Sequence, residues 1–193
     1  APENTLPAVE LAWAVGAETS TGVQNDAAGL AALCRRHGAR LCLDCVSALG
    51  VVPVDLGDVY LASGVSGKAL GSFSGLALVF YNQPVAPSSR LPRSLDLGLY
   101  DAREVPFTMQ SELVNALHRA LDVLDLGARA GRLAALARWL REELRGMGLP
   151  PLAPEECAFP GATTIPLGSR LRSVDVGDRL EEALVERMAM ALD

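Results

Sequence analysis

Two short apolar runs, each followed by a chemically reactive side chain, constrain the fold of this chain more than any other feature. The first, Leu41-Cys42-Leu43, leads directly to Asp44, and the second, Val59-Tyr60-Leu61-Ala62, leads through a loop of serine and glycine to Lys68. Ligands of a parallel α/β sheet bind beyond the carboxyl ends of its strands, so we expect this carboxylate and this amine on one rim. The alternative interpretation is an ordinary strand-end aspartate and an ordinary surface lysine.

Further predicted strands and a helix complete this sheet. Residues 9–15 are mostly apolar, which is typical of a parallel strand buried on both faces. Asn25 or Asp26 can cap a helix after this strand and Gly38 can end it, so that a right-handed strand-helix-strand unit leads to the first run. Residues 76–81 follow the preceding strand too closely for a crossover helix, which predicts an antiparallel return.

Leucines at helical spacing predict two more helices in the second half of the chain. The first covers residues 108–126, where Gly127 interrupts or ends it, and the second ends at the glycines of residues 146–148. The leucines expected on inner helix faces are Leu30, Leu33, Leu113, Leu117, Leu121, Leu124, Leu133, Leu136, Leu140 and Leu144. A short strand at residues 163–167 and a helix from Asp178 are expected next, as in part of a small α+β domain.

The composition argues against several classes of function. The net charge is −6 and the 17 Lys and Arg residues form no basic cluster, which argues against a nucleic-acid-binding surface. The apolar runs are short and interrupted, so no membrane-spanning segment is expected. Cys42 and Cys45 have the spacing of a zinc-binding pair, but a strand is predicted through them and no second pair is present. We therefore expect reduced thiols in a cytoplasmic protein, and no metal site.

A carboxylate and a lysine on one rim suit pyridoxal 5'-phosphate. The lysine can hold the cofactor's aldehyde as a Schiff base, and Asp44 can keep the pyridine nitrogen protonated so that the ring accepts electrons. Lys68 is the only lysine in the chain, which argues against a surface lysine without a function. Taken by themselves, the two residues are compatible with this cofactor at Asp44 and Lys68, and equally with an ordinary strand-end aspartate and surface lysine.

Three motifs in series resemble those of the class V aminotransferases. They are Glu18-Thr19-Ser20-Thr21-Gly22, Asp44-Cys45-Val46-Ser47-Ala48-Leu49-Gly50 and Ser63-Gly64-Val65-Ser66-Gly67-Lys68-Ala69-Leu70. Their order and spacing are similar to those of the alanine–glyoxylate and serine–pyruvate aminotransferase group, which are fold-type I pyridoxal-phosphate enzymes. The resemblance implies the C-terminal half of such an enzyme, with an α/β fold. Residues 1–126 would hold the mostly parallel sheet of the large domain's second half, and residues 127–193 a partial small α+β domain.

The resemblance also implies a role for each site residue. Lys68 and Asp44 would be catalytic, as the proton-shuttling Schiff-base lysine and as the partner of the pyridine nitrogen. The other cofactor-binding positions would be Val46 under the ring, Thr19 near the phenolic oxygen, Ser66 near the phosphate, and Thr108 reaching the phosphate of a partner subunit. A strand-end cap for Thr19 and a helix N-cap for Thr108 are the simpler alternatives. Gly67 departs from the pattern, since glutamine is usual there and histidine is usual in cysteine desulfurases.

The function implied is transfer of an amino group between a small amino acid and a 2-oxo acid. A homodimer, or a complex with a first-half polypeptide, is expected, because the family's glycine-rich phosphate turn and ring-stacking aromatic belong to its first half. The arginine that binds the substrate carboxylate is not assigned, since Arg170, Arg172 and Arg179 match no family position. The alternatives are a lyase or desulfurase on the same scaffold, and a non-catalytic fragment or partner-dependent subunit.

Overall fold

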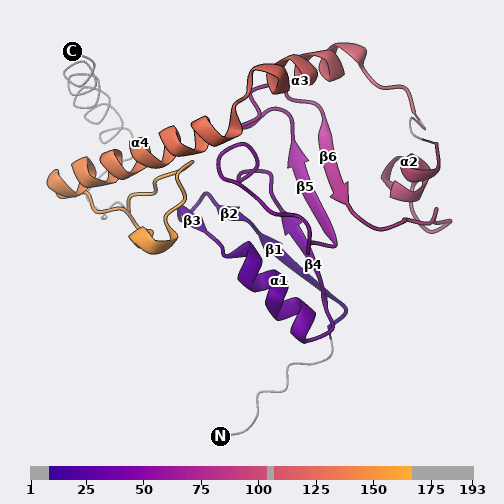
Figure 1. The fold of residues 1–193 in the computed structure, drawn as a ribbon, viewed down its shortest axis with the longest axis horizontal. Helices are drawn as coiled ribbons and strands as arrows, with labels where there is room; N and C mark the ends of the chain where they lie inside the picture. The colour runs from indigo at the N-terminus through magenta and orange to yellow at the C-terminus, as the bar shows by residue number, and fades with distance from the viewer. Residues whose placement is uncertain (1–8, 104–106, 167–193) are drawn as a thin grey trace, which may run out of the picture.

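Within residues 9–103 and 107–166, which the computed structural model describes, the central sheet has four strands in the order β1-β4-β5-β6 (Figure 1). The strands are β1 (Leu11–Val15), β4 (Arg40–Asp44), β5 (Leu61–Val65) and β6 (Ala77–Tyr81). β1, β4 and β5 run parallel to one another, and β6 is antiparallel to β5. The predicted α/β fold with a mostly parallel sheet is therefore confirmed.

A short hairpin and a helix connect β1 to β4. They are β2 (Ala17–Glu18), β3 (Val23–Gln24) and α1 (Ala27–Arg36). Asp26 caps α1, because its Oδ1 accepts a hydrogen bond of 2.9 Å from the backbone nitrogen of Gly29. Gly38 follows the helix with a φ of +68°, a conformation that favours glycine. The predicted start and end of this helix are both confirmed.

Helix α1 covers one face of the sheet. Leu41 and Leu43 of β4 are buried in a cluster with Ala31 and Cys34 of α1. Leu33 is 40 % exposed, so its predicted place on the inner face is wrong. Smaller side chains, those of Ala31 and Cys34, fill that face instead, and they let the helix lie close to the strands.

The opposite face of the sheet is exposed at both edges. Leu11 and Trp13 of β1 are 49 % and 70 % exposed, and Val79 of β6 is 42 % exposed. Side chains alternate along a strand, and Ala12, Ala14 and Phe80 pack against the cluster under α1. Their strand neighbours Leu11, Trp13 and Val79 therefore lie on the opposite face. The expected burial of β1 on both faces is therefore wrong for the described part of the chain.

Strand β5 begins two residues later than its apolar run predicted. The run indicated residues 59–62, whereas the strand covers Leu61–Val65 and so includes Gly64. A Cβ atom at residue 64 would lie 2.8 Å from Cδ2 of Leu49 and 3.3 Å from a ring carbon of Phe80. The glycine that resembled part of a loop is therefore required by packing within the strand.

The predicted helix over residues 108–126 is interrupted near its end. The helices of this region are α2 (Leu97–Arg103), α3 (Ser111–Val123) and α4 (Leu126–Gly146), with single turns of 3-10 helix at Arg93–Leu95 and Glu155–Cys157. Asp125 starts α4, since its Oδ1 accepts a hydrogen bond of 2.9 Å from the backbone nitrogen of Ala128. The break therefore falls at Leu124 and Asp125 rather than at Gly127.

Helices α3 and α4 form an arm along one end of the sheet (Figure 1). Several of their apolar side chains are exposed. No residue of α3 is buried within the described part of the chain, and Leu121 is 47 % exposed. In α4, Leu144 is buried as predicted, but Leu136 is 50 % exposed. Among residues 9–103 and 107–166, no helix is long and apolar enough to cross a membrane.

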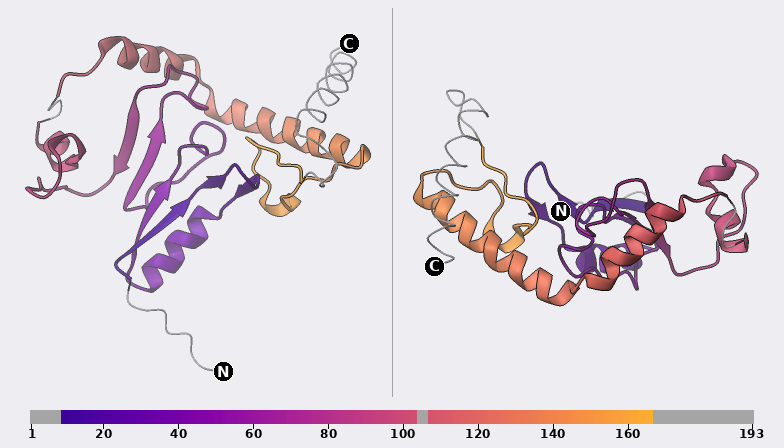
Figure 2. Two further views of the ribbon diagram at one scale, coloured as in Figure 1. Left: turned by 180° about the vertical axis from the view of Figure 1, so that it is seen from behind. Right: turned by 90° about the horizontal axis from the view of Figure 1, so that it is seen from above.

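Residues 151–166, here called the return segment, lead from α4 back to the hairpin of β2 and β3 (Figure 2). The strand predicted at 163–167 is absent from residues 163–166, the part that the structure describes. The helix predicted from Asp178 lies outside the described residues, as do Arg170, Arg172 and Arg179.

Phe159 anchors the return segment on the sheet domain. Its side chain is 2 % exposed and packs in a second hydrophobic cluster with Ala17, Ala48 and Val51. Its backbone nitrogen donates a hydrogen bond of 2.8 Å to the carbonyl oxygen of Gly22. The return segment therefore supports both the hairpin and the turn that follows Asp44.

Candidate active site

The carboxyl ends of β1, β4 and β5 meet at Asp44. In the register of the sheet, Asp44 lies between Val15 and Ser63. Its backbone carbonyl accepts a hydrogen bond of 2.8 Å from the nitrogen of Gly16. The half-buried carboxylate of Asp44 shares a row with Val79 of β6, because residues paired across strands lie on one face. It therefore stands on the face of the sheet away from α1.

One oxygen of Asp44 is held and the other is available. Oδ1 accepts hydrogen bonds from the backbone nitrogen of Val46 at 2.9 Å and from Oγ of Ser63 at 3.2 Å. Oδ2 accepts no hydrogen bond from residues 9–103 and 107–166. The carboxylate is thus fixed in direction, with one oxygen left to accept a proton-bearing group of a ligand.

Lys68 reaches from the loop after β5 to the turn after Asp44. Its Nζ donates a hydrogen bond of 3.0 Å to Oγ of Ser47, and its side chain is exposed. It forms no ion pair within the described part of the chain. The structure therefore places the amine and the Asp44 turn on one rim, the geometry that the two apolar runs predicted.

Ser66 closes the loop that carries Lys68. The side chain is fully buried, its Oγ donates a hydrogen bond of 2.6 Å to the carbonyl oxygen of Phe73, and it accepts one of 3.2 Å from the nitrogen of Leu76. These bonds tie the two ends of the loop together. The predicted contact of this hydroxyl with a phosphate stays a prediction, and the loop gives the hydroxyl a structural task.

The glycine before the lysine has a packing reason. A Cβ atom at Gly67 would lie 2.7 Å from Cα of Ser74 and closer still to that residue's Oγ. The glutamine or histidine that relatives were expected to carry here would displace residue 74 and open the loop. The contact with Ser74 therefore requires glycine at residue 67 in this loop.

The three remaining predicted site residues are less closely tied to the rim. Thr19 is exposed in the turn between β2 and β3, where its carbonyl oxygen accepts a hydrogen bond of 3.2 Å from Oγ1 of Thr164. Val46 is half-buried two residues beyond Asp44. Thr108 is exposed before α3, and the N-cap of that helix is Gln110, so the alternative of an N-cap at Thr108 is wrong. The cofactor roles of these three residues stay predictions.

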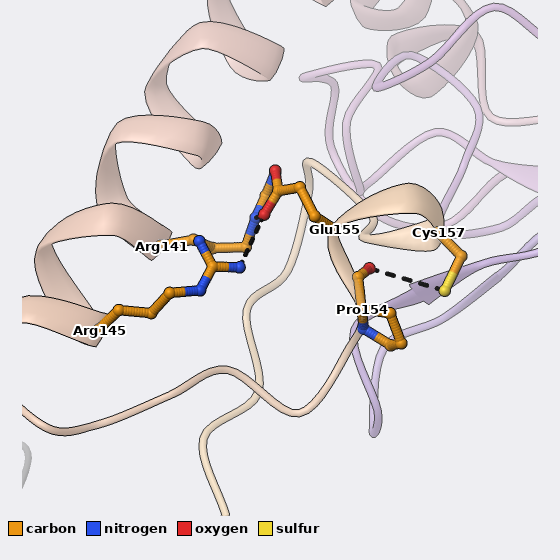
Figure 3. Close-up of polar contacts among 5 residues, drawn as sticks. All are labelled: Arg141, Arg145, Pro154, Glu155 and Cys157. Atoms are coloured by element: carbon orange, nitrogen blue, oxygen red, sulfur yellow. Dashed lines mark hydrogen bonds and ion pairs between the residues drawn. The ribbon is translucent and has the colours of Figure 1, made fainter.

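Sequence reasoning missed an ionic cluster that holds the return segment (Figure 3). Glu155 accepts hydrogen bonds from Nε and an Nη of Arg141, the former at 3.1 Å, and from Arg145 at 2.8 Å. Beside it, Sγ of Cys157 contacts the carbonyl oxygen of Pro154 at 3.7 Å. The hydrogen bonds from Arg141, and then the one from Arg145, lower the pKa of Glu155 to about 2. No signal in the sequence joins residues 141 and 155, since their spacing fits no single helix.

We expect Glu155→Gln to destabilise the chain near neutral pH, because it leaves the buried guanidinium of Arg141, 7 % exposed, without its counter-charge. The pKa of Glu155 is lowered from 4.5 to about 2 in the folded chain, so the pairing stabilises it fully above about pH 4.5 and is lost as pH falls toward 2. Urea unfolding of both proteins over this range checks the prediction. The difference in free energy of unfolding between parent and variant should decrease on acidification. A difference that is constant or absent contradicts the prediction.

Comparisons with known proteins find transaminases among the relatives of this chain. A 2-aminoethylphosphonate–pyruvate transaminase from Pseudomonas putida is 29 % identical over 191 residues, which cover 91 % of this chain and 52 % of that protein. A second such transaminase, from Paraburkholderia xenovorans, is 32 % identical over 164 residues, or 76 % of this chain and 44 % of that protein. No protein-family model matches the chain.

A solved aminotransferase structure is also similar to this chain. The alanine–glyoxylate aminotransferase of Nostoc sp. has a TM-score of 0.73 and 30 % identity to this chain, and the match covers 90 % of this chain and 50 % of that one. The chain thus spans about half the length of the relatives it matches. In sequence and in fold, the chain is therefore similar to about half of an aminotransferase.

Proposed function

We propose that the chain is the lysine-bearing part of a class V, pyridoxal-phosphate-dependent aminotransferase. The observation that carries this proposal is the hydrogen bond from Nζ of Lys68 to the turn after Asp44, at the carboxyl ends of two adjacent parallel strands. The similarity to transaminases over about nine-tenths of the chain supports it. Nothing in the described residues favours a lyase, a desulfurase or a non-catalytic fragment over this activity.

The residues at the rim fit part of this cofactor well. An exposed lysine with no ion pair among the described residues can reach an aldehyde, and the free oxygen of Asp44 can accept the ring's N–H. The phosphate is less well provided for, because the hydroxyl of Ser66 already bonds within its loop.

Each rim residue has a distinct task in this proposal. When bound, the cofactor supplies the ring that accepts electrons from the substrate. Lys68 binds the aldehyde and later carries a proton at its Nζ, a general-base contribution of typically ~10²–10⁴-fold in rate. Asp44 keeps the ring nitrogen protonated, and Val46 N and Ser63 Oγ hold its carboxylate in place for that bond. Val46 is proposed to pack under the ring, Thr19 to lie near its phenolic oxygen, and Thr108 to contact the phosphate of a partner subunit.

We propose that the acceptor is a small 2-oxo acid, since the named relatives act with pyruvate or glyoxylate. The domain limits proposed are residues 1–126 for the cofactor-binding part and 127–193 for the small domain. A cytoplasmic location is proposed from the free thiols of Cys34, Cys42, Cys45 and Cys157.

The proposed partner is the polypeptide that corresponds to the other half of the relatives. β1 is an edge strand of the described sheet, and its neighbouring face exposes Leu11 and Trp13. An open strand edge beside apolar side chains favours pairing with another strand. A second copy of the chain, meeting at the exposed apolar side chains Val114, Leu121 and Val123 of α3, is the alternative arrangement.

In a protein that contains both halves, Lys68→Ala should abolish amino transfer from a small amino acid to pyruvate or glyoxylate. Lys68→Arg is the matched control, since arginine keeps the positive charge but does not bind the aldehyde, and it should be equally inactive. Turnover is measured through the new amino acid. Activity in the arginine variant within about tenfold of the parent, roughly 1.4 kcal/mol, would show that charge alone suffices and would overturn the assignment.

The chain alone should self-associate and bind the cofactor weakly. Trp13→Glu places a charge on the exposed face beside β1 and should reduce association, measured by sedimentation velocity. Leu95→Glu is the control, since Leu95 is 66 % exposed but lies in a short turn far along the chain from this edge. A monomeric parent that binds pyridoxal phosphate with micromolar affinity would contradict the proposed dependence on a partner.

A further inference from the structure

The side chain that Lys68 contacts belongs to none of the roles described above. Ser47 lies three residues after Asp44, in the turn that follows β4, and is half-buried. Its Oγ accepts a hydrogen bond of 3.0 Å from Nζ of Lys68, the only hydrogen bond of that amine within residues 9–103 and 107–166. The contact joins residues 21 positions apart, so it depends on the fold and not on the local sequence.

A hydroxyl is a chemically suitable partner for a lysine that must both bind an aldehyde and carry a proton. A carboxylate in this place would hold the amine in its charged form, because an adjacent negative charge favours the ammonium. A serine hydroxyl accepts from the ammonium and can rotate to donate to the neutral amine. Ser47 can therefore keep Nζ in one place in either protonation state.

The turn that carries Ser47 is itself firmly placed. Ala48, the next residue, is 2 % exposed and packs with Phe159 of the return segment. Gly50 has a φ of +86°, and a Cβ there would lie 2.9 Å from the carbonyl carbon of Ala69. The turn after Asp44 and the loop of Lys68 are thus in close backbone contact, which fixes the distance between the two side chains.

We propose that Ser47 is a positioning residue that directs Nζ of Lys68 toward the Asp44 side of the rim before the lysine reacts. The inference rests on the proposed function for its meaning in catalysis. The contact itself can be tested without any cofactor, because Lys68 is the only lysine and its modification is easy to follow.

The test measures how fast Lys68 is acetylated by an uncharged succinimidyl ester, in the purified full chain. The peptide that contains Lys68 is quantified by mass spectrometry, which separates it from the α-amino group. Ser47→Ala should raise the acetylation rate by about fivefold, the factor expected when one hydrogen bond of ordinary net strength no longer competes for the amine. Ser47→Thr keeps the hydroxyl and should stay within about twofold of the parent.

Ser72→Ala is the matched control, since it removes a hydroxyl from the loop of Lys68 that has no hydrogen-bond partner among the described residues. It should leave the acetylation rate unchanged. Urea unfolding midpoints of all variants show whether the fold is kept. Equal acetylation rates in Ser47→Ala and the parent overturn the inference. An increase in Ser72→Ala as large as that in Ser47→Ala also overturns it.

The same variants separate this inference from the proposed function. In a protein with both halves, Ser47→Ala should lower kcat for amino transfer with KM nearly unchanged, and Ser47→Thr should restore it. If Lys68 carries the cofactor but its acetylation rate does not depend on residue 47, the positioning role fails and the proposed function stands. If acetylation follows residue 47 but no variant ever binds the cofactor, the proposed function fails while the placement of Lys68 by Ser47 holds.

Discussion

The site depends on how Asp44 joins three strand ends. Its backbone carbonyl accepts a hydrogen bond from Gly16, the residue after β1, and its carboxylate accepts one from Ser63 of β5. Parallel pairing makes this possible, since it brings the carboxyl ends of β1, β4 and β5 to one rim. The turn after Asp44 then presents Ser47 to Lys68. One sheet register thus creates the contacts that orient both the carboxylate of Asp44 and the amine of Lys68.

The elements between β1 and Asp44 could be predicted because local chemistry determines them. Asp26 has the side chain that an N-cap requires, Gly38 has the freedom that a helix end requires, and the run before Asp44 is apolar throughout because β4 is buried. The placement of Asp44 and Lys68 on one rim followed from topology alone. In these places local preference and tertiary structure favour the same conformation.

The features that could not be predicted depend on contacts between distant residues. Gly64 lies within β5 because Leu49 and Phe80 leave no room for a side chain, a reason that no local pattern contains. The pairing of Arg141 with Glu155 requires the chain to reverse after α4. Leu33, Leu121 and Leu136 follow the helical period but are exposed, because periodicity shows which side chains share a face and not whether anything covers it.

In the proposed site, Lys68 and Asp44 bind the two ends of one cofactor. The most direct measurement mixes pyridoxal phosphate with a protein that contains both halves, reduces the mixture with borohydride, and maps the adduct by peptide mass spectrometry. We expect the cofactor on Lys68 in the parent, with Asp44→Asn forming the adduct more slowly or at a lower yield. Cofactor attached only to the α-amino group, or a yield at Lys68 that ignores residue 44, would contradict the claim.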